Sequence, residues 1–304
     1  MLDICLLGTG GMMPLPGRYL TSLYVRFNGN GLLIDCGEGT QIAMHKKGLS
    51  AHNINTILLT HFHADHVSGL PGMLLTMGNG DRTEPVKIIG PKGLDRILAA
   101  VRTIAPELPF SIEMQEIEGN ADHFSIDGME IDAFKVQHNL ICYGYSIEVH
   151  RQGKFDVERA KAQDIPQLLW NPLQKGQTIE QDGRTFTPDM VLGPERKGLK
   201  VVYSTDTRPA ASIAQYGQGA DLMILEGMYG EDDKQEKAKQ YRHMTMREAA
   251  RIAQKAQPRE MWLTHFSPSV VRPDVFADDI RKIFPATVFP KDGRDVTLRF
   301  EEEQ

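Results

Sequence analysis

The sequence of 304 residues contains only three cysteines, Cys5, Cys36 and Cys142, which are far apart and lie in apolar stretches. An odd number of isolated cysteines argues against a disulfide framework, and the lack of a CxxC pair argues against a cysteine metal knuckle. We therefore expect buried thiols in a reducing compartment.

Long apolar runs and excess positive charge are also missing. No run reaches the length of a membrane-spanning helix, and Asp3 lies where a signal peptide needs positive charge. These features predict an unanchored, cytoplasmic protein. The formal net charge of -6 removes any whole-molecule attraction to nucleic acid, so an RNA substrate would need a local basic patch or a cationic site.

What the chain does contain is a regular alternation of strand-like and helix-like segments. Short apolar runs occur near Ile57, Val86, Met129, Leu199, Asp221 and Met261. A helix-like segment starts near Pro91, and another follows Thr245, which has capping-box spacing to Glu248. With 41% hydrophobic residues to build a core, this alternation predicts a layered α/β architecture.

The segment at about 151–200 interrupts this alternation. It contains four prolines and no long apolar run, and its nine Lys/Arg against seven Asp/Glu give it a local net charge of +2. We expect a single domain over residues 1–304 with an inserted arm or excursion at 151–200. A solvated surface insertion is the simpler alternative.

The strongest local signal is the motif THFHADHVSG, directly after the apolar run NTILL. It places His61, His63, Asp65 and His66 within six residues. Imidazole and carboxylate are ligands that borderline divalent metals prefer, and four of them this close together suffice to serve two ions.

Three further apolar runs end in the same kind of residue: DAFKVQ leads to His138, KVVYST to Asp206 and MWLT to His265. Each alone would more often be a surface or core residue. Ligands gather at the carboxyl ends of strands in α/β sheets, so together these positions predict one metal site. Glu226 ends a fifth run and His243 precedes the capped helix, and for both the functional and the structural interpretations stay open.

The other histidines follow no strand-end rule, and we expect His45, His52, His123 and His150 at the surface. Asp35, in LLIDCGEGTQ, is a candidate for hydrogen bonding to groups around the metals. The Gly-rich turn after it lacks the spacing and lysine of a Walker loop.

The motif HFHADH matches the HxHxDH signature of the metallo-β-lactamase superfamily, and the chain resembles the ribonuclease Z family of tRNA 3′-processing endoribonucleases in particular. The matching blocks, from the first residues to about Pro268, are LLGTGG, LLIDCGEGTQ, LTHFHADHVSGLPGMLLT, GPKG, YSTDTRP, HMT and LTHFSP. The resemblance implies a four-layer αββα sandwich, commonly a homodimer, that acts on precursor tRNA.

The resemblance also implies roles for individual residues. His61, His63 and His138 would hold one Zn²⁺, and Asp65, His66 and His265 a second, with Asp206 bridging; Mn²⁺ or Fe²⁺ are alternative ions. Asp65 would orient the attacking water, and His243, steered by Glu226, would protonate the departing 3′ oxygen. Arg18 would contact substrate, in a loop that senses the CCA end in some members.

The chain departs from the family pattern at three places. The arm reads IPQLLWNPLQKG where a GlyPro-rich tip is usual, Tyr19 replaces a common asparagine, and HMT replaces HST. The altered arm motivates a second hypothesis, a metal-dependent hydrolase of small phosphodiesters, sulfate esters or other compounds. A third, a non-catalytic RNA-binding relative, conflicts with the presence of all seven ligand residues.

Overall fold

The computed structural model describes residues 1–230 and 232–301, which form two compact units. Of the described residues, unit 1 comprises those of 1–148 and 200–299, and unit 2 comprises 149–199 together with 300 and 301. The two boundaries of the segment 149–199 each fall within a strand of the second sheet of unit 1.

The first sheet of unit 1 has the strand order β16-β1-β2-β3-β4-β5-β6. Its strands are β1 (Leu2–Gly8), β2 (Ser22–Phe27), β3 (Asn30–Ile34), β4 (Ile54–Leu58), β5 (Val86–Pro91), β6 (Ile112–Ile117) and β16 (Arg294–Leu298). Strands β3 to β6 are parallel, whereas β16 pairs antiparallel with β1. Strand β16, near the C-terminus, therefore lies beside the first strand of the chain.

The second sheet has the order β15-β14-β13-β12-β9-β8-β7. Its strands are β7 (Ala121–Ile126), β8 (Met129–Lys135), β9 (Tyr143–Arg151), β12 (Arg196–Ser204), β13 (Leu222–Glu226), β14 (Glu260–Thr264) and β15 (Thr287–Val288). Because β12, β13 and β14 are parallel and adjacent, their carboxyl ends lie side by side.

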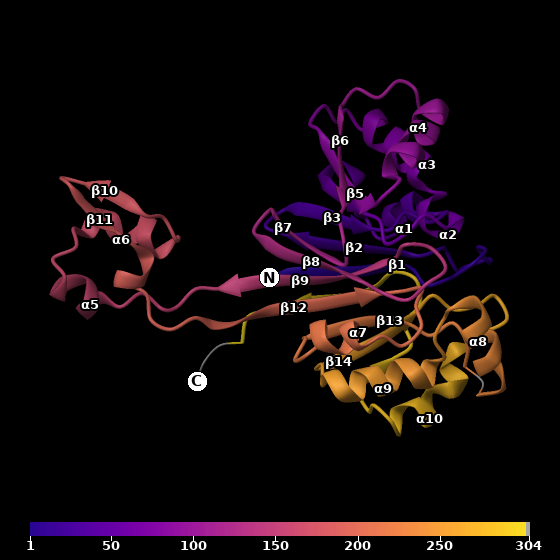
Figure 1. Ribbon diagram of the computed structural model, residues 1–304. Coiled ribbons are helices and arrows are strands. Elements are labelled where there is room, and N and C mark those ends of the chain that lie inside the picture. The colour runs from indigo at the N-terminus through magenta and orange to yellow at the C-terminus, as the bar shows by residue number, and fades with distance from the viewer. Residues whose placement is uncertain (231, 302–304) are drawn as a thin grey trace. The chain divides into compact units, whose positions relative to one another are not determined.

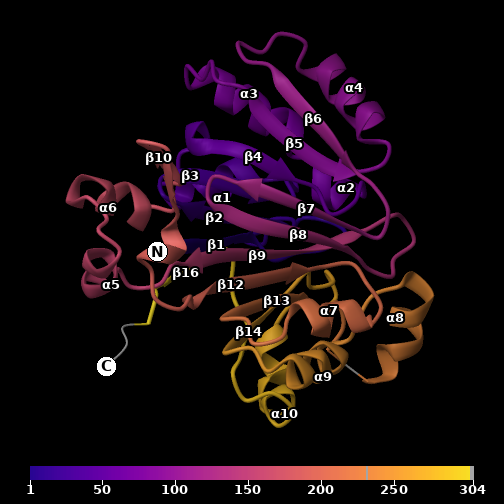
Figure 2. The same ribbon diagram turned by 60° about the vertical axis from the view of Figure 1, so that its left-hand side comes forward.

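Helices cover the outer faces of both sheets (Figures 1 and 2). The first sheet carries α1 (Thr40–Lys46), α2 (Ala64–Val67), α3 (Leu70–Asn79) and α4 (Leu94–Ile104). The second carries α7 (Ala211–Tyr216), α8 (Gln235–Tyr241), α9 (Met246–Ala256) and α10 (Ala277–Arg281). Short 3₁₀ turns occur at Ala51–Asn53, Pro188–Met190, Asp232–Lys234 and Pro273–Phe276. This α/β arrangement of two sheets between two helical layers confirms the predicted αββα sandwich.

Each sheet shares a hydrophobic core with its own helices. Leu33 and Ile88 of the first sheet pack with Met73 of α3, and Leu225 of the second packs with Ala250 of α9. Burying a side chain of this size stabilises the fold by roughly 1.5–3 kcal/mol. The helix α9 begins as predicted, with the Thr245 side chain accepting from the backbone N–H of Glu248. Both sheets are therefore rigid supports for the loops at their ends.

Unit 2 is built from α5 (Val157–Ala162), α6 (Gln167–Gln174) and a hairpin of β10 (Ile179–Gln181) and β11 (Arg184–Phe186). It has a small apolar cluster of its own, in which Leu169 and Leu173 of α6 pack with Val191. The sequence did not predict this cluster, because its members come from short elements and form no continuous run.

The expectations for the cysteines and for four of the histidines are confirmed. The three cysteines are buried and unpaired, and the four histidines without a strand-end position are exposed. Among the described residues, no helix is long and apolar enough to cross a membrane.

Candidate active site

The residues predicted at strand ends come together at one edge of unit 1. His61 and His63 follow β4, with Asp65 and His66 at the start of α2; His138 follows β8, Asp206 follows β12 and His265 follows β14. Their ligand atoms fall into two groups whose members lie within 4.8 Å of one another, and a third group of the same size limit joins Asp206 and His265 to His243. All except His63 are buried.

The first group consists of His61, His63, His138 and Asp206. The Nδ1 atom of His63 lies 2.9 Å from Nε2 of His61 and 3.2 Å from Nε2 of His138. Oδ2 of Asp206 lies 3.6 Å from His61 Nε2 and 3.7 Å from His138 Nε2. Three ring nitrogens and one carboxylate oxygen thus converge on a common point.

The second group consists of Asp65, His66 and His265. The Nε2 atoms of the two histidines lie 3.3 Å apart, and Oδ2 of Asp65 lies 3.3 Å from His265 Nε2. Oδ1 of Asp206 lies 3.1 Å from His66 Nε2 and 3.0 Å from His265 Nε2. Asp206 therefore presents one oxygen to each group.

The chemistry of these donors fits a pair of divalent cations. Ring nitrogens that face each other cannot all donate hydrogen bonds, and Oδ1 of Asp206 is buried without a well-directed hydrogen bond among the described residues. Burial lowers the pKa of His61, His63 and His138, which favours the neutral ring that ligates metals. The first group is therefore suited to an ion of the zinc type.

Around the second group, the ionised carboxylates are stabilised by neighbouring positive charge. Burial opposes protonation of His265, but Asp206 and Asp65 outweigh it and raise the pKa of His265 to about 10. Burial likewise opposes ionisation of Asp65 and Asp206, yet neighbouring imidazoles hold the pKa of both carboxyls below the ordinary value. Either protons or cations supply the balancing charge.

Supporting hydrogen bonds fix the orientation of the ligands. Asp35 accepts from the backbone N–H of Thr60 at 2.8 Å and lies 2.8 Å from Nδ1 of His66. This confirms the supporting position expected for Asp35. Nδ1 of His138 lies 3.1 Å from the carbonyl oxygen of Arg242, whose side chain donates back to the His138 carbonyl at 2.9 Å. Such partners set the ring orientation of metal-ligating histidines.

His243 and Glu226 lie against the same site. The Nδ1 atom of His243 is 3.0 Å from Oε2 of Glu226, which is fully buried at the end of β13. Burial opposes protonation of His243, but the Glu226 carboxylate raises its pKa above the ordinary value. The ring is thus well placed to hold a proton near neutral pH.

Two residues in this network were missed by sequence reasoning. Arg208 donates to the carbonyl oxygen of His243 and forms an ion pair with Glu248, which also accepts from the backbone N–H of Thr245 at 3.0 Å. The sequence showed Glu248 only as half of a capping box, and nothing in its spacing linked it to Arg208.

Strained backbone surrounds the same site. Met12, Asp35, Arg242 and His265 have φ values of 70°, 59°, 58° and 56°. Residues other than glycine rarely adopt this left-handed backbone conformation, and those that do are concentrated at functional sites. All four contact a ligand residue or are one.

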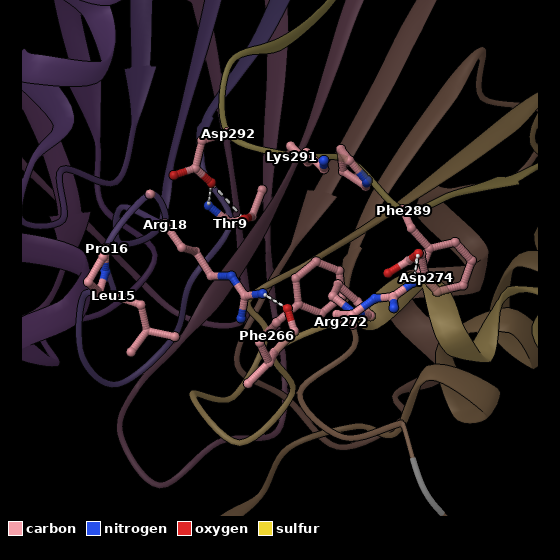
Figure 3. Close-up of a pocket in the computed structure, with 14 residues that line it drawn as sticks. Thr9, Leu15, Pro16, Arg18, Phe266, Arg272, Asp274, Phe289, Lys291 and Asp292 are labelled. Carbon is pink, nitrogen blue, oxygen red and sulfur yellow. Dashed lines mark hydrogen bonds and ion pairs between the residues drawn. The ribbon is translucent and has the colours of Figure 1, made fainter.

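Arg18 lies apart from the two ligand groups, in a cavity of about 580 Å³ that Figure 3 shows in close-up. Its guanidinium donates to the carbonyl oxygens of Val270 and Val271, both at 2.8 Å. Arg272 and Lys291 also line this cavity. Phe266, which follows His265, forms part of its wall.

Comparisons with known proteins cover the whole chain. Residues 2–156 match the family model described as anti-Pycsar protein Apyc1, and residues 148–266 match that of the beta-lactamase superfamily domain. Ribonuclease Z of Lachnospira eligens is 58% identical over 303 residues, covering 100% of both chains, and that of Agathobacter rectalis is 57% identical with the same coverage. The crystal structure of human tRNase Z, short form, is 23% identical, with a TM-score of 0.71 over 98% of this chain and 100% of that one, which shows a shared fold.

Proposed function

Because the chain belongs to the ribonuclease Z family, with a metallo-β-lactamase fold, we infer that it is a metal-dependent endoribonuclease that removes 3′ trailers from precursor tRNA. Cleavage leaves a 3′-hydroxyl on the tRNA and a 5′-phosphate on the trailer. The observation that carries this inference is the pair of ligand groups sharing Asp206, the arrangement that a dinuclear hydrolase needs.

We propose Zn²⁺ for both positions, with Mn²⁺ or Fe²⁺ as alternatives. His61, His63 and His138 would hold one ion, and Asp65, His66 and His265 the other, with Asp206 between them. When bound, the ions supply Lewis-acid charge that activates water and neutralises the phosphate. The lowered pKa values of the first group's three imidazoles, which favour the neutral ring, support this choice.

Residues of the chain itself orient the water, donate the proton and bind the RNA. Asp65 orients the attacking water, since its Oδ2 is fixed by the backbone N–H of Met12 at 2.6 Å and by His265. His243 gives its proton to the departing 3′ oxygen, and Glu226 holds the ring and favours its charged form. Arg18 contributes to RNA binding in a cavity that also carries Arg272 and Lys291.

A pre-tRNA cleavage assay tests the function. Purified protein is stripped of metal, loaded with Zn²⁺, Mn²⁺ or Fe²⁺, and incubated with labelled transcripts with and without CCA. We expect about two metal equivalents per chain and a tRNA product ending in a 3′-hydroxyl. If the protein cleaves pre-tRNA at none of these metal loadings, the proposed function is wrong.

The second candidate function, hydrolysis of small esters, is motivated by the tip of unit 2. There the segment IPQLLWNPLQKG contains α6, and the indole N–H of Trp170 donates to the Ile165 carbonyl at 3.0 Å, so a packed helix takes the place of a GlyPro-rich tip. Turnover of bis(p-nitrophenyl) phosphate, an aryl sulfate and pre-tRNA should be compared. A clear preference for pre-tRNA would exclude this candidate.

We further propose that residues 151–200 are an inserted arm of a single domain and bind tRNA. The local net charge of +2 in a chain of -6 supports this assignment. Replacing the arm with a short linker should raise KM for pre-tRNA and leave turnover of bis(p-nitrophenyl) phosphate unchanged. Equal effects on both substrates would contradict it.

The family resemblance also leads us to propose a cytoplasmic homodimer, and the three buried, unpaired thiols support a reducing compartment. Light scattering coupled to size-exclusion chromatography measures the molar mass, for which twice the 34.0 kDa chain mass is expected.

A further inference from the structure

The loop between β1 and β2 touches two residues of the metal site through its backbone. The N–H of Met12 donates to Oδ2 of Asp65 at 2.6 Å. Gly11 lies so close to the His265 ring that an added Cβ would be 2.7 Å from it. The loop therefore contacts both Asp65 and His265 directly.

One carboxylate, that of Asp292, holds both limbs of the loop. Its Oδ1 accepts from the backbone N–H and the hydroxyl of Thr9, at 3.0 and 2.7 Å, and its Oδ2 accepts from the backbone N–H of Tyr19 at 2.5 Å. Figure 3 shows this carboxylate turned toward Thr9 at the wall of the cavity. Thr9 and Tyr19 lie ten residues apart in sequence, so Asp292 closes the loop at its base.

The fold places Asp292 at this position through a tight turn. The Arg294 N–H donates to the Lys291 carbonyl at 3.0 Å, and Gly293 has a φ of 79°, as the third residue of such a turn requires. The Gly293 N–H donates to the Leu6 carbonyl at 2.7 Å, and β16 then pairs with β1. The C-terminal strand thus fixes Asp292 against the end of β1.

We propose that Asp292 is a positioning residue for catalysis: by holding the loop from Thr9 to Tyr19, it keeps the Met12 N–H directed at Asp65 and so sets the orientation of that carboxylate. This inference rests on the proposed function, in which Asp65 orients the attacking water. Asp292 itself contacts neither of the two ligand groups.

The test uses Asp292→Asn in the full-length, metal-loaded protein. The amide keeps one acceptor but turns an N–H₂ donor toward the Thr9 or Tyr19 N–H. We expect kcat to fall by about 10- to 100-fold on both pre-tRNA and bis(p-nitrophenyl) phosphate, with KM and metal content unchanged. Asp295→Asn is the matched control, because Asp295 lies three residues away and its exposed carboxylate accepts from Lys47 at the surface.

Three outcomes would overturn the proposal. These are a kcat close to wild type on bis(p-nitrophenyl) phosphate, a change confined to KM for pre-tRNA, and a loss of activity that follows a loss of metal. A double-mutant cycle adds a readout that a general loss of stability would not move. In single-turnover assays, Asp292→Asn should add little to Asp65→Asn, whereas additive losses would refute an action through Asp65.

A milder variant covers the case in which Asp292→Asn fails to fold. Thr9→Val removes only the hydroxyl donor to Asp292 and keeps the shape of the side chain. It should give a smaller fall in kcat with the same unchanged KM, and an unchanged kcat would count against the proposal. If wild type hydrolyses bis(p-nitrophenyl) phosphate but not pre-tRNA, the proposed function fails, while the small substrate still tests the positioning role.

Discussion

Gly11 offers a sharp test of how tightly the site is built, because a single methyl group there would meet the His265 ring. A Cβ at this position would lie 2.7 Å from Cε1 and Nε2 and 2.9 Å from Nδ1. Non-bonded atoms of this kind are ordinarily about 3.5 Å apart, so the ring or the loop must move by roughly 0.8 Å.

Neither partner is free to move. His265 is fully buried, its Nε2 lies 3.0 Å from Asp206 Oδ1, and the Gly11 N–H donates to the Phe266 carbonyl at 3.1 Å. Forcing an extra methyl into such a site costs about 1–3 kcal/mol. A displacement approaching 1 Å lowers rates by about 100-fold, so we expect Gly11→Ala to lower kcat by that order and to weaken metal binding at the second group.

The assay measures kcat on pre-tRNA, metal equivalents per chain and thermal stability for Gly11→Ala and for Gly80→Ala. Gly80 is the matched control, because a Cβ there meets only the Met77 and Thr76 carbonyl oxygens at the ordinary distance of 3.4 Å. Gly80→Ala should retain full activity and metal content. If Gly11→Ala also binds two ions and turns over at the wild-type rate, the tight contact with His265 does not matter for function.

Four further predictions follow from the site and its surroundings. Asp206→Ala should reduce metal content in both groups, as measured by elemental analysis, and a full complement of two ions would contradict the shared role. His243→Ala should keep the metals but slow cleavage by about 10²–10⁴-fold, and normal rates would refute the proton-donor assignment. Glu226→Gln should move the alkaline limb of the kcat profile to lower pH, because Glu226 raises the pKa of His243 and its removal releases that proton sooner; an unmoved limb would argue against it. The hydrogen bond to Asp132 raises the pKa of His123 on β7. His123 should therefore stabilise the fold below about pH 6.5 and lose this effect as the pH rises through its raised pKa. In urea denaturation, His123→Gln should have a lower free energy of unfolding than wild type at pH 5.5 and the same value at high pH.

Much of the site could be predicted because each ligand directly follows an apolar strand. In the second sheet the register pairs Ser204 with Leu225 and Glu226 with Thr264, so the residues after β12 and β14 and at the end of β13 must lie side by side. Periodicity alone cannot show that β4, in the other sheet, ends at the same place. The general rule that ligands gather at strand ends predicted that these positions come together, whereas the division of the ligands into two groups came from the family resemblance.

The parts that escaped prediction depend on contacts without a local sequence signal. Thr9 and Asp292 are 283 residues apart, and Arg208 reaches the carbonyl of His243 from 35 residues away. The left-handed conformation of His265 is equally hidden, because histidine shows no general preference for it strong enough to read from one chain. Every residue has a backbone carbonyl and every residue except proline has a backbone N–H, so no pattern marks the few that fix a catalytic group.

The division of Asp206 between the two groups implies that they act together. Its Oδ2 faces His61 and His138, whereas its Oδ1 faces His66 and His265. If only the first group were filled, Oδ1 would face His66 and His265, whose raised pKa values allow a protonated ring to balance it. If only the second group were filled, Oδ2 would face His61 and His138, whose lowered pKa values favour neutral rings, and an unbalanced buried charge costs several kcal/mol. Filling the second group alone therefore leaves a carboxylate oxygen that favours a cation at the first.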